Sequence, residues 1–418
     1  MFKKGLKVVL IQLLGIAIGV VSLFYIAGEM PPEVYSLIGI YALINGVVTT
    51  FSHLGLETRM MREALMWMNV GDMERVKEYT TQSLVSRLIG MIILTPFVLA
   101  FLNYINETKY NGEYVMILLT FYLSALLSAF IDSMSIVVRS QGGYVFSTFV
   151  RTMNTDVVKV LGILFFWVYG ASAYLYFYAL SSLPLFLLFL WKVYPCLSLR
   201  YIKLGSIKEK IIRNKYLWLR TDVDYFKTYA DSLLVSVVFT PTIMGSYTIY
   251  KTLENMCRNV IEGFFDVLAQ ETVKYKGNHG NLVLVERKIK KVRNLFLLLC
   301  AIGVVIFAFS SNWIITLLRL NHYEYITEIF YCIFVVSAIY LIGKYEINII
   351  GLYAGSKTTF KLSIIQMIIT IVAFLFVLVM PSLYGVFLQR LFAYGAFTLI
   401  SIVYFKQRRN ILYTEVLD

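Results

Sequence analysis

Long apolar stretches recur along the whole chain, and each has the length of a membrane-spanning helix. Such a helix needs about 20 mostly apolar residues. Twelve windows meet this requirement: 6–28, 34–54, 84–105, 114–138, 144–169, 174–194, 216–239, 245–268, 294–317, 326–347, 362–380 and 385–405. The pattern predicts an all-α polytopic membrane protein with twelve transmembrane helices.

A basic interval divides these windows into two groups of six. We therefore expect an N-terminal six-helix bundle over residues 1–194, a basic cytoplasmic connector over 195–215 and a C-terminal six-helix bundle over 216–418. Bundles of this kind enclose a central cavity in transporters that are built from two related halves.

Lysine and arginine are distributed unevenly between the loops. Of the 38 in the chain, only Lys109 and Arg319 fall in loops on one side of the membrane. Because cytoplasmic loops carry the excess of these residues, both termini are expected to be cytoplasmic. The net charge of +13 then belongs to the inner membrane surface, where anionic lipids are the expected partners, and not to a nucleic-acid interface.

Composition and motifs exclude several classes of protein. With 59% hydrophobic and 15% charged residues, the chain is far more apolar than a soluble domain. Its four cysteines and three histidines follow no disulfide or metal-ligand spacing. The sequence has no P-loop, dinucleotide-binding turn, nucleophile elbow or HExxH motif. We expect no cofactor and no enzymatic activity.

Three of the predicted helices carry ionisable residues at helical spacing. An isolated charge at the bilayer centre costs about 2.5–3.5 kcal/mol, so such residues face a cavity or a partner. One interpretation is a hydrated central cavity. The other is structural pairing between neighbours such as Glu254 and Arg258. The functional hypothesis depends on the first.

The residue types suggest two roles within this cavity. Cations can hold a phosphate or diphosphate, arginine by paired hydrogen bonds, and acids can line the cavity or couple transport to an ion. Arg87 is expected near the inner interface, where its replacement would impair export less than that of Arg258 or Arg220. The candidate cations are Arg151, Lys159, Arg220, Lys227, Lys251 and Arg258, and the candidate acids are Asp132, Asp156, Asp224, Asp231, Glu254 and Glu262.

Four segments carry a resemblance to a known family: Leu54–Arg59 with Arg62–Ala64, Asp231–Leu234, Met244–Tyr247 and Pro381–Gly385. In these the chain resembles the Wzx-type polysaccharide repeat-unit flippases, whose superfamily also holds the multidrug and toxin-extrusion antiporters. The resemblance implies alternating access in the bacterial cytoplasmic membrane. It implies an undecaprenyl-diphosphate-linked oligosaccharide as cargo, for O-antigen, lipopolysaccharide or capsule, and the polysaccharide polymerase machinery as a further partner.

Two other functions stay open at this point. A cation-coupled multidrug exporter would share the same fold. A membrane polysaccharide polymerase is less favoured, because the longest outer loop, Asn106–Glu113, is too short to build an extracytoplasmic catalytic site.

Overall fold

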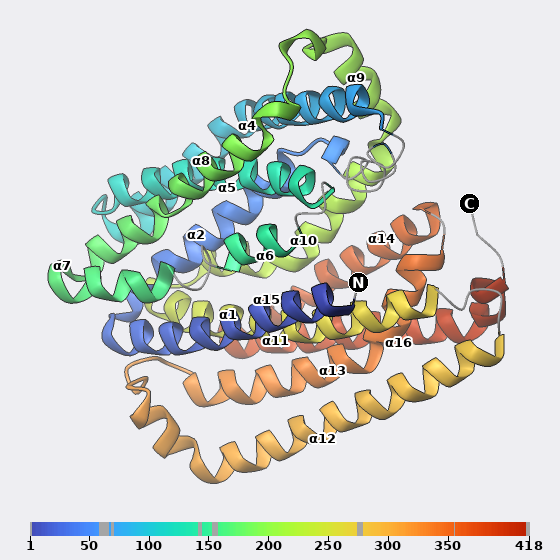
Figure 1. Cartoon of the computed structure of the whole chain (residues 1–418). Helices are drawn as coiled ribbons and strands as arrows, with labels where there is room; N and C mark the ends of the chain where they lie inside the picture. The colour runs from blue at the N-terminus through green and yellow to red at the C-terminus, as the bar shows by residue number, and fades with distance from the viewer. Residues whose placement is uncertain are drawn as a thin grey trace. The chain divides into compact units, whose positions relative to one another are not determined.

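The computed structural model describes residues 2–57, 67, 71–140, 144–152, 158–273, 279–354 and 356–414. All regular secondary structure in these residues is helical. The chain divides into two compact units, Met1–Gly245 and Ser246–Asp418, whose helices are labelled in Figure 1.

The first unit is organised around α5 (Val115–Ser140). This helix packs against α2 (Pro32–Phe51), α4 (Met73–Tyr110), α7 (Val158–Leu180) and α8 (Ser182–Val193). Its core includes Met134 and Val137 of α5 with Phe189 and Val193 of α8. The other helices of this unit are α1 (Phe2–Glu29), α6 (Tyr144–Thr152), α9 (Leu204–Arg213) and α10 (Lys215–Val238).

The helix α7 folds back on itself at Gly170. This residue has φ 81° and ψ −171°, a conformation that is open to glycine and strained for other residues. The rings of Phe165 and Phe177 stack with centroids 4.3 Å apart, whereas twelve residues of a straight helix would separate them by about 18 Å. The sequence placed a turn between the windows 144–169 and 174–194, and the described residues place it at Gly170.

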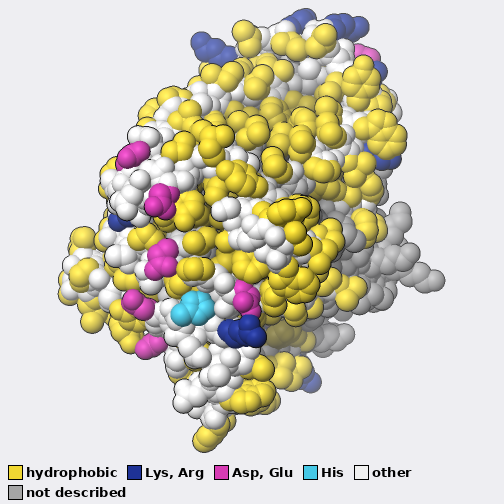
Figure 2. All heavy atoms as spheres, turned by 90° about the vertical axis from the view of Figure 1, so that its left-hand side faces the viewer, with side chains coloured by type: hydrophobic (Ala, Val, Ile, Leu, Met, Phe, Trp, Pro, Cys, Tyr) yellow, Lys and Arg dark blue, Asp and Glu magenta, His cyan; other side chains and the backbone are white. Residues whose placement is uncertain are grey.

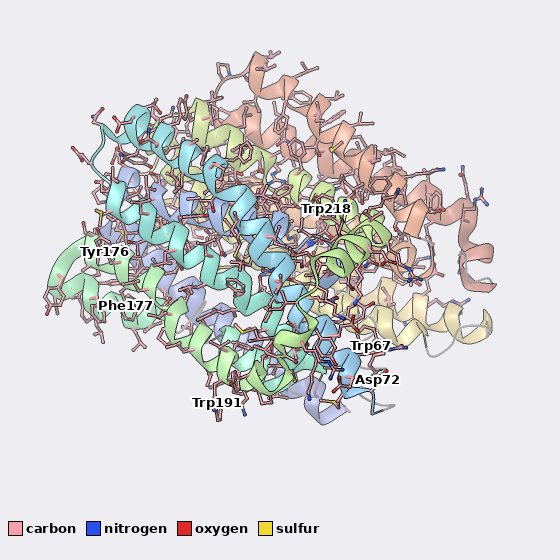
Figure 3. The ribbon with its side chains drawn as sticks, turned by 90° about the horizontal axis from the view of Figure 1, so that it is seen from above. Trp67, Asp72, Tyr176, Phe177, Trp191 and Trp218 are labelled. Carbon is pink, nitrogen blue, oxygen red and sulfur yellow. The ribbon has the colours of Figure 1, made fainter. Side chains whose placement is uncertain are left out.

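Local capping determines where α4 begins. The Asp72 side chain accepts a hydrogen bond from the Arg75 backbone N–H at 3.2 Å, as an N-cap residue does. Its own N–H donates to the Trp67 carbonyl at 2.9 Å, and Figure 3 shows these two residues side by side. The Trp67 ring lies 4.5 Å from that of Tyr79, which ties the entry of the helix to the core of the unit.

The second unit contains most of α11 (Pro241–Val273) and the five helices that follow it. They are α12 (His279–Leu317), α13 (Ile326–Tyr353), α14 (Ser356–Ala373), α15 (Leu375–Val379) and α16 (Leu383–Thr414). The helix α13 packs against α12 and α16, and α14 and α15 pack against α16. Figure 1 shows α12 running alongside α13. The core of this unit includes Phe265, Leu341, Tyr345 and Ile349.

Eight helical segments of the described residues are long and apolar enough to cross a membrane. They support a polytopic membrane protein, while the predicted count of twelve and the position of the termini stay predictions. The helices α10 and α11 fall outside the eight, because both carry several charges along their length. Figure 2 shows hydrophobic side chains over most of the face it presents, with acidic side chains gathered on its left part.

The boundary between the compact units lies thirty residues beyond the end of the connector, because α10 packs against α2 in the first unit. The Tyr225 hydroxyl of α10 donates to the Leu43 carbonyl of α2 at 3.1 Å. The predicted division into residues 1–194, 195–215 and 216–418 concerns transport halves and stays a prediction.

Candidate functional site

Charged side chains of α11, α13 and α16 meet in the interior of the second unit. Four of them, Lys251, Glu254, Lys344 and Arg390, are buried. Burying a charge is costly unless it is paired and hydrogen-bonded. Their partners therefore define the site.

Glu254 lies between two cations. Its Oε2 is 3.2 Å from Nζ of Lys251, one turn earlier on α11, and 3.7 Å from Nη2 of Arg390 on α16. The side chains of all three are less than a tenth exposed. This carboxylate therefore joins α11 to α16.

Glu262, two turns further along α11, is also shared by two cations. Its Oε1 is 3.3 Å from Nζ of Lys344 on α13 and 4.0 Å from Nε of Arg258. The Tyr340 hydroxyl donates a hydrogen bond to the same oxygen. The Glu262 side chain is 37% exposed, compared with 4% for that of Glu254, so the second carboxylate is the more accessible.

A small pocket lies beside Glu254 and Arg258. Its cavity volume is about 10 Å³, close to the space that one water molecule needs. Nε of Arg258 is buried there with no hydrogen-bond partner among the described residues. The lining residues are Glu254, Arg258, Ile261, Val336, Ser337, Tyr340 and Tyr394. The pocket thus offers an arginine, a carboxylate, three hydroxyl groups and two aromatic rings.

The described side chains of this cluster carry more positive than negative charge. Each of the two carboxylates is shared by two cations. The nearby Glu346 does not change this balance, because it pairs with Arg293 of α12 at 3.4 Å. The cluster has a formal excess of two positive charges, which favours a negatively charged ligand over a cation.

The first unit holds a separate buried ion pair that the sequence did not reveal. Arg87 of α4 donates to both carboxylate oxygens of Glu57 through Nε and Nη2. Its Nη1 donates to the Thr49 carbonyl at 2.7 Å and to the Ser52 hydroxyl at 3.0 Å. Arg87 is only 2% exposed, so it is unsuitable as the mild reference substitution that the sequence suggested. The available signal was Glu57, which lies in the Leu54–Arg59 segment that carries the resemblance.

The structure brings together part of the predicted site. Lys251 pairs with Glu254 and Arg258 with Glu262, at the spacings noted in the sequence, and Glu254 and Arg258 line the same pocket. In the first unit, Arg220 and Asp224 form an ion pair at 3.6 Å, Asp231 is buried, and Asp132 is half-buried. Asp156 and the side chains of Arg151, Lys159 and Lys227 lie outside what the structure describes.

All four charged residues of α11 in this site form ion pairs, which the cavity hypothesis did not assume. The i,i+3 and i,i+4 pairs on this helix are Lys251–Glu254 and Arg258–Glu262, and both carboxylates also bind cations of other helices. A central cavity lined by these residues stays a prediction. Sequence reasoning missed Lys344 and Arg390, although each is the single lysine or arginine of its predicted window, and this was the available signal.

The described residues show no metal-ion chemistry. Among them, no group of three or more His, Cys, Asp or Glu side chains could hold a metal ion. All four cysteines are free.

Comparisons with known proteins place the fold. No family model matches the sequence, and no curated protein matches it. Solved structures do match along nearly the whole chain. One is the inward-facing conformation of a multidrug resistance MATE family transporter of the MOP superfamily, with a TM-score of 0.75, 14% identity and coverage of 97% of this chain and 98% of that chain.

The chain has the fold of MATE transporters.

Two further structures with this MATE-like fold represent different states and functions. The outward-facing conformation of a multidrug resistance MATE transporter matches with a TM-score of 0.65, 13% identity and coverage of 98% and 96%. A MOP superfamily transporter from Pyrococcus furiosus, described as having a binding pocket of reverse polarity that suggests a different function, matches with a TM-score of 0.58, 11% identity and coverage of 99% and 97%. The structures with a MATE-like fold named here are transporters, not enzymes.

Proposed function

We propose that this protein is a flippase that works by alternating access. It moves undecaprenyl-diphosphate-linked oligosaccharide repeat units from the inner to the outer leaflet of the bacterial cytoplasmic membrane, for O-antigen, lipopolysaccharide or capsule synthesis. The MATE-like fold supports a transport cycle, because solved structures of this fold include inward-facing and outward-facing conformations.

The excess of positive charge around Glu254 and Glu262 is the observation that favours this cargo. Its described side chains include four cations and two carboxylates. A diphosphate headgroup is negatively charged and would compensate this excess, whereas a cationic drug would add to it. Arginine suits this cargo because its planar guanidinium binds phosphate oxygens in pairs.

The pocket residues can divide the headgroup between them. Arg258 is the pocket cation with an unused Nε donor, and it would bind a phosphate oxygen. Tyr340, Tyr394 and Ser337 also line the pocket, and their hydroxyl groups would bind the hydroxyl-rich sugars in a conformation of the transport cycle in which the pocket has opened beyond its present volume of about one water molecule. The polyprenyl tail would stay in the bilayer beside the apolar exterior of the helices.

Removal of the protein from its host tests this function. We expect lipid-linked repeat units to accumulate on the inner leaflet and the surface polymer to be lost. Complementation with Arg258→Gln should restore much less polymer than complementation with Arg408→Gln, a change of the same type at an exposed arginine near the end of α16. Normal surface polymer after removal, in a host with no second flippase, would contradict the proposal.

A multidrug exporter is the second candidate, because solved structures with this fold are multidrug resistance transporters. Under this function the carboxylates Asp132, Asp224, Asp231, Glu254 and Glu262 would couple transport to a cation. Removal of the protein would then raise drug sensitivity and leave the surface polymer normal. The same deletion strain therefore separates the two functions.

The predicted partners follow from the flippase function. The polymerase machinery would receive the repeat unit at the outer leaflet. Anionic lipids would contact the basic connector, whose Arg200 and Lys203 are exposed.

A further inference from the structure

We propose that Glu262 is an internal counter-anion: its carboxylate occupies the anion position beside Arg258 and Lys344 in the empty protein, and the phosphate of the cargo displaces it. This inference rests on the proposed function for the identity of the cargo. The ligand chemistry is a phosphate or diphosphate group. It could come from a lipid-linked headgroup or from a free phosphate.

The Glu262 carboxylate is held loosely enough beside Arg258 for another anion to displace it. Nε of Arg258 is 4.0 Å from its Oε1, which is too far for a hydrogen bond. Because Nε of Arg258 has no other hydrogen-bond partner among the described residues, the guanidinium gains a bond when a closer anion arrives. The 37% exposure of Glu262 gives its side chain room to move away.

Glu254 differs in each of these respects. It is 4% exposed, and its two cations, Lys251 and Arg390, are less than a tenth exposed. A bound anion could not replace this carboxylate without opening the contact between α11 and α16. Of the two carboxylates, Glu262 is therefore the one that can be exchanged.

The pocket makes the exchange direct. Arg258 and Tyr340 both line it, and both also contact Glu262. The pocket alone has room for about one water molecule, so an anion that binds the guanidinium or the phenol has to enter the space of the Glu262 carboxylate and removes a partner from it. Departure of Glu262 also releases Lys344, whose Nζ lies 3.0 Å from the Tyr340 hydroxyl. Two positive charges then become available, which suits a group with about two negative charges.

The return of Glu262 would help to release the cargo. A carboxylate that competes for Arg258 and Lys344 lowers the affinity for the anion, so that the headgroup is not held after translocation. Removing the negative charge at this position should tighten anion binding and slow transport. If Glu262 only held helices together, its replacement would not tighten anion binding while slowing transport.

Calorimetric titration of the purified full-length protein in detergent tests the exchange. The probes are inorganic pyrophosphate and farnesyl diphosphate. We expect Glu262→Gln to tighten the binding of both by about tenfold, the factor expected when a like charge roughly 10 Å away is removed at an effective dielectric constant of about 20. Glu262→Asp, which keeps the charge, should retain the wild-type affinity.

Glu286→Gln is the matched control. Glu286 is likewise a carboxylate shared by two cations, Lys290 at 2.9 Å and Arg409, but neither of these cations lines the pocket. Its replacement should leave both affinities unchanged. Equal tightening by Glu286→Gln would show a general charge effect and overturn the exchange.

The remaining outcomes separate the inference from the function on which it rests. If wild type binds the probes, Arg258→Gln does not, and Glu262→Gln is unchanged or weaker, the exchange is wrong and the anion site stands. If wild type binds neither probe, both the exchange and the diphosphate cargo are wrong. Tighter binding of farnesyl diphosphate than of pyrophosphate identifies the lipid-linked headgroup as the source, and equal binding identifies a free phosphate.

Discussion

Replacement of Arg87 should destabilise the protein more than the loss of any exposed arginine. Arg87→Met removes a buried guanidinium that binds both oxygens of Glu57, the Thr49 carbonyl and the Ser52 hydroxyl. The Glu57 carboxylate stays behind, 4% exposed, and keeps the Ser133 hydroxyl as a donor. One neutral donor, the hydroxyl that the described residues supply, compensates a buried charge poorly.

The magnitude follows from the burial of both partners. Removing one member of a buried ion pair costs about 3–5 kcal/mol, because the other charge is left uncompensated. At roughly 2 °C per kcal/mol for a large domain, the midpoint of thermal unfolding should fall by about 6–10 °C. Thermal unfolding of the detergent-solubilised protein measures this, with recovery of monodisperse protein after heating as a second readout.

Arg200→Met is the matched control. Arg200 contacts Glu74 at 3.7 Å, and both side chains are more than half exposed. Pairs of this kind contribute about 0–1 kcal/mol, so the midpoint should move by no more than about 2 °C.

A second substitution separates the buried charge from lost packing. Adding Glu57→Gln to Arg87→Met removes the orphaned charge and should recover part of the loss, whereas unrelated substitutions would add their effects. The reasoning is refuted if Arg87→Met unfolds at the same temperature as Arg200→Met, or if the double variant is less stable by the full sum of both single changes.

Three other predictions test local features of the fold. Gly170→Ala should cost about 1–3 kcal/mol through its backbone conformation, which is open essentially only to glycine, because no atom outside its own stretch of chain lies within 4 Å of the added Cβ. Gly205→Ala, also in open space but without a positive φ, should be neutral or stabilising by about 0.5–1 kcal/mol, and the two thermal midpoints compare directly. Gly245→Ala places a Cβ against the Pro32 carbonyl oxygen, and we expect a midpoint drop larger than that of Gly170→Ala; an equal or smaller drop would contradict the close approach. Lys210→Met removes the contacts of the Lys210 ammonium with Glu78 at 2.6 Å and Gln82 at 2.7 Å, both on α4. Proteolysis of the 195–215 connector should increase as a result. Unchanged cleavage would show that these contacts do not hold α9 against α4.

Much of the local structure could be predicted from the sequence, because its causes lie within a few residues. Apolar runs of membrane-spanning length become helices wherever they occur. A helical spacing of 3 and 4 places Lys251, Glu254, Arg258 and Glu262 on one side of α11 whatever surrounds them. The sequence also indicated the turn near Gly170, since the apolar pattern breaks there.

The pairing of these charges was decided by tertiary structure. Lys344 and Arg390 are 90 and 136 residues from Glu254 in the chain, and only the packing of α13 and α16 brings them to the α11 carboxylates. The four α11 residues are two cations and two acids, and the packing adds two more cations, which gives the cluster an excess of positive charge. From the sequence, Arg87 was expected near the membrane interface. The packing of α4 beside the end of α2 instead buries it with Glu57. Helical periodicity is a property of the local backbone, whereas the partner of a buried charge depends on which distant segments exclude water around it.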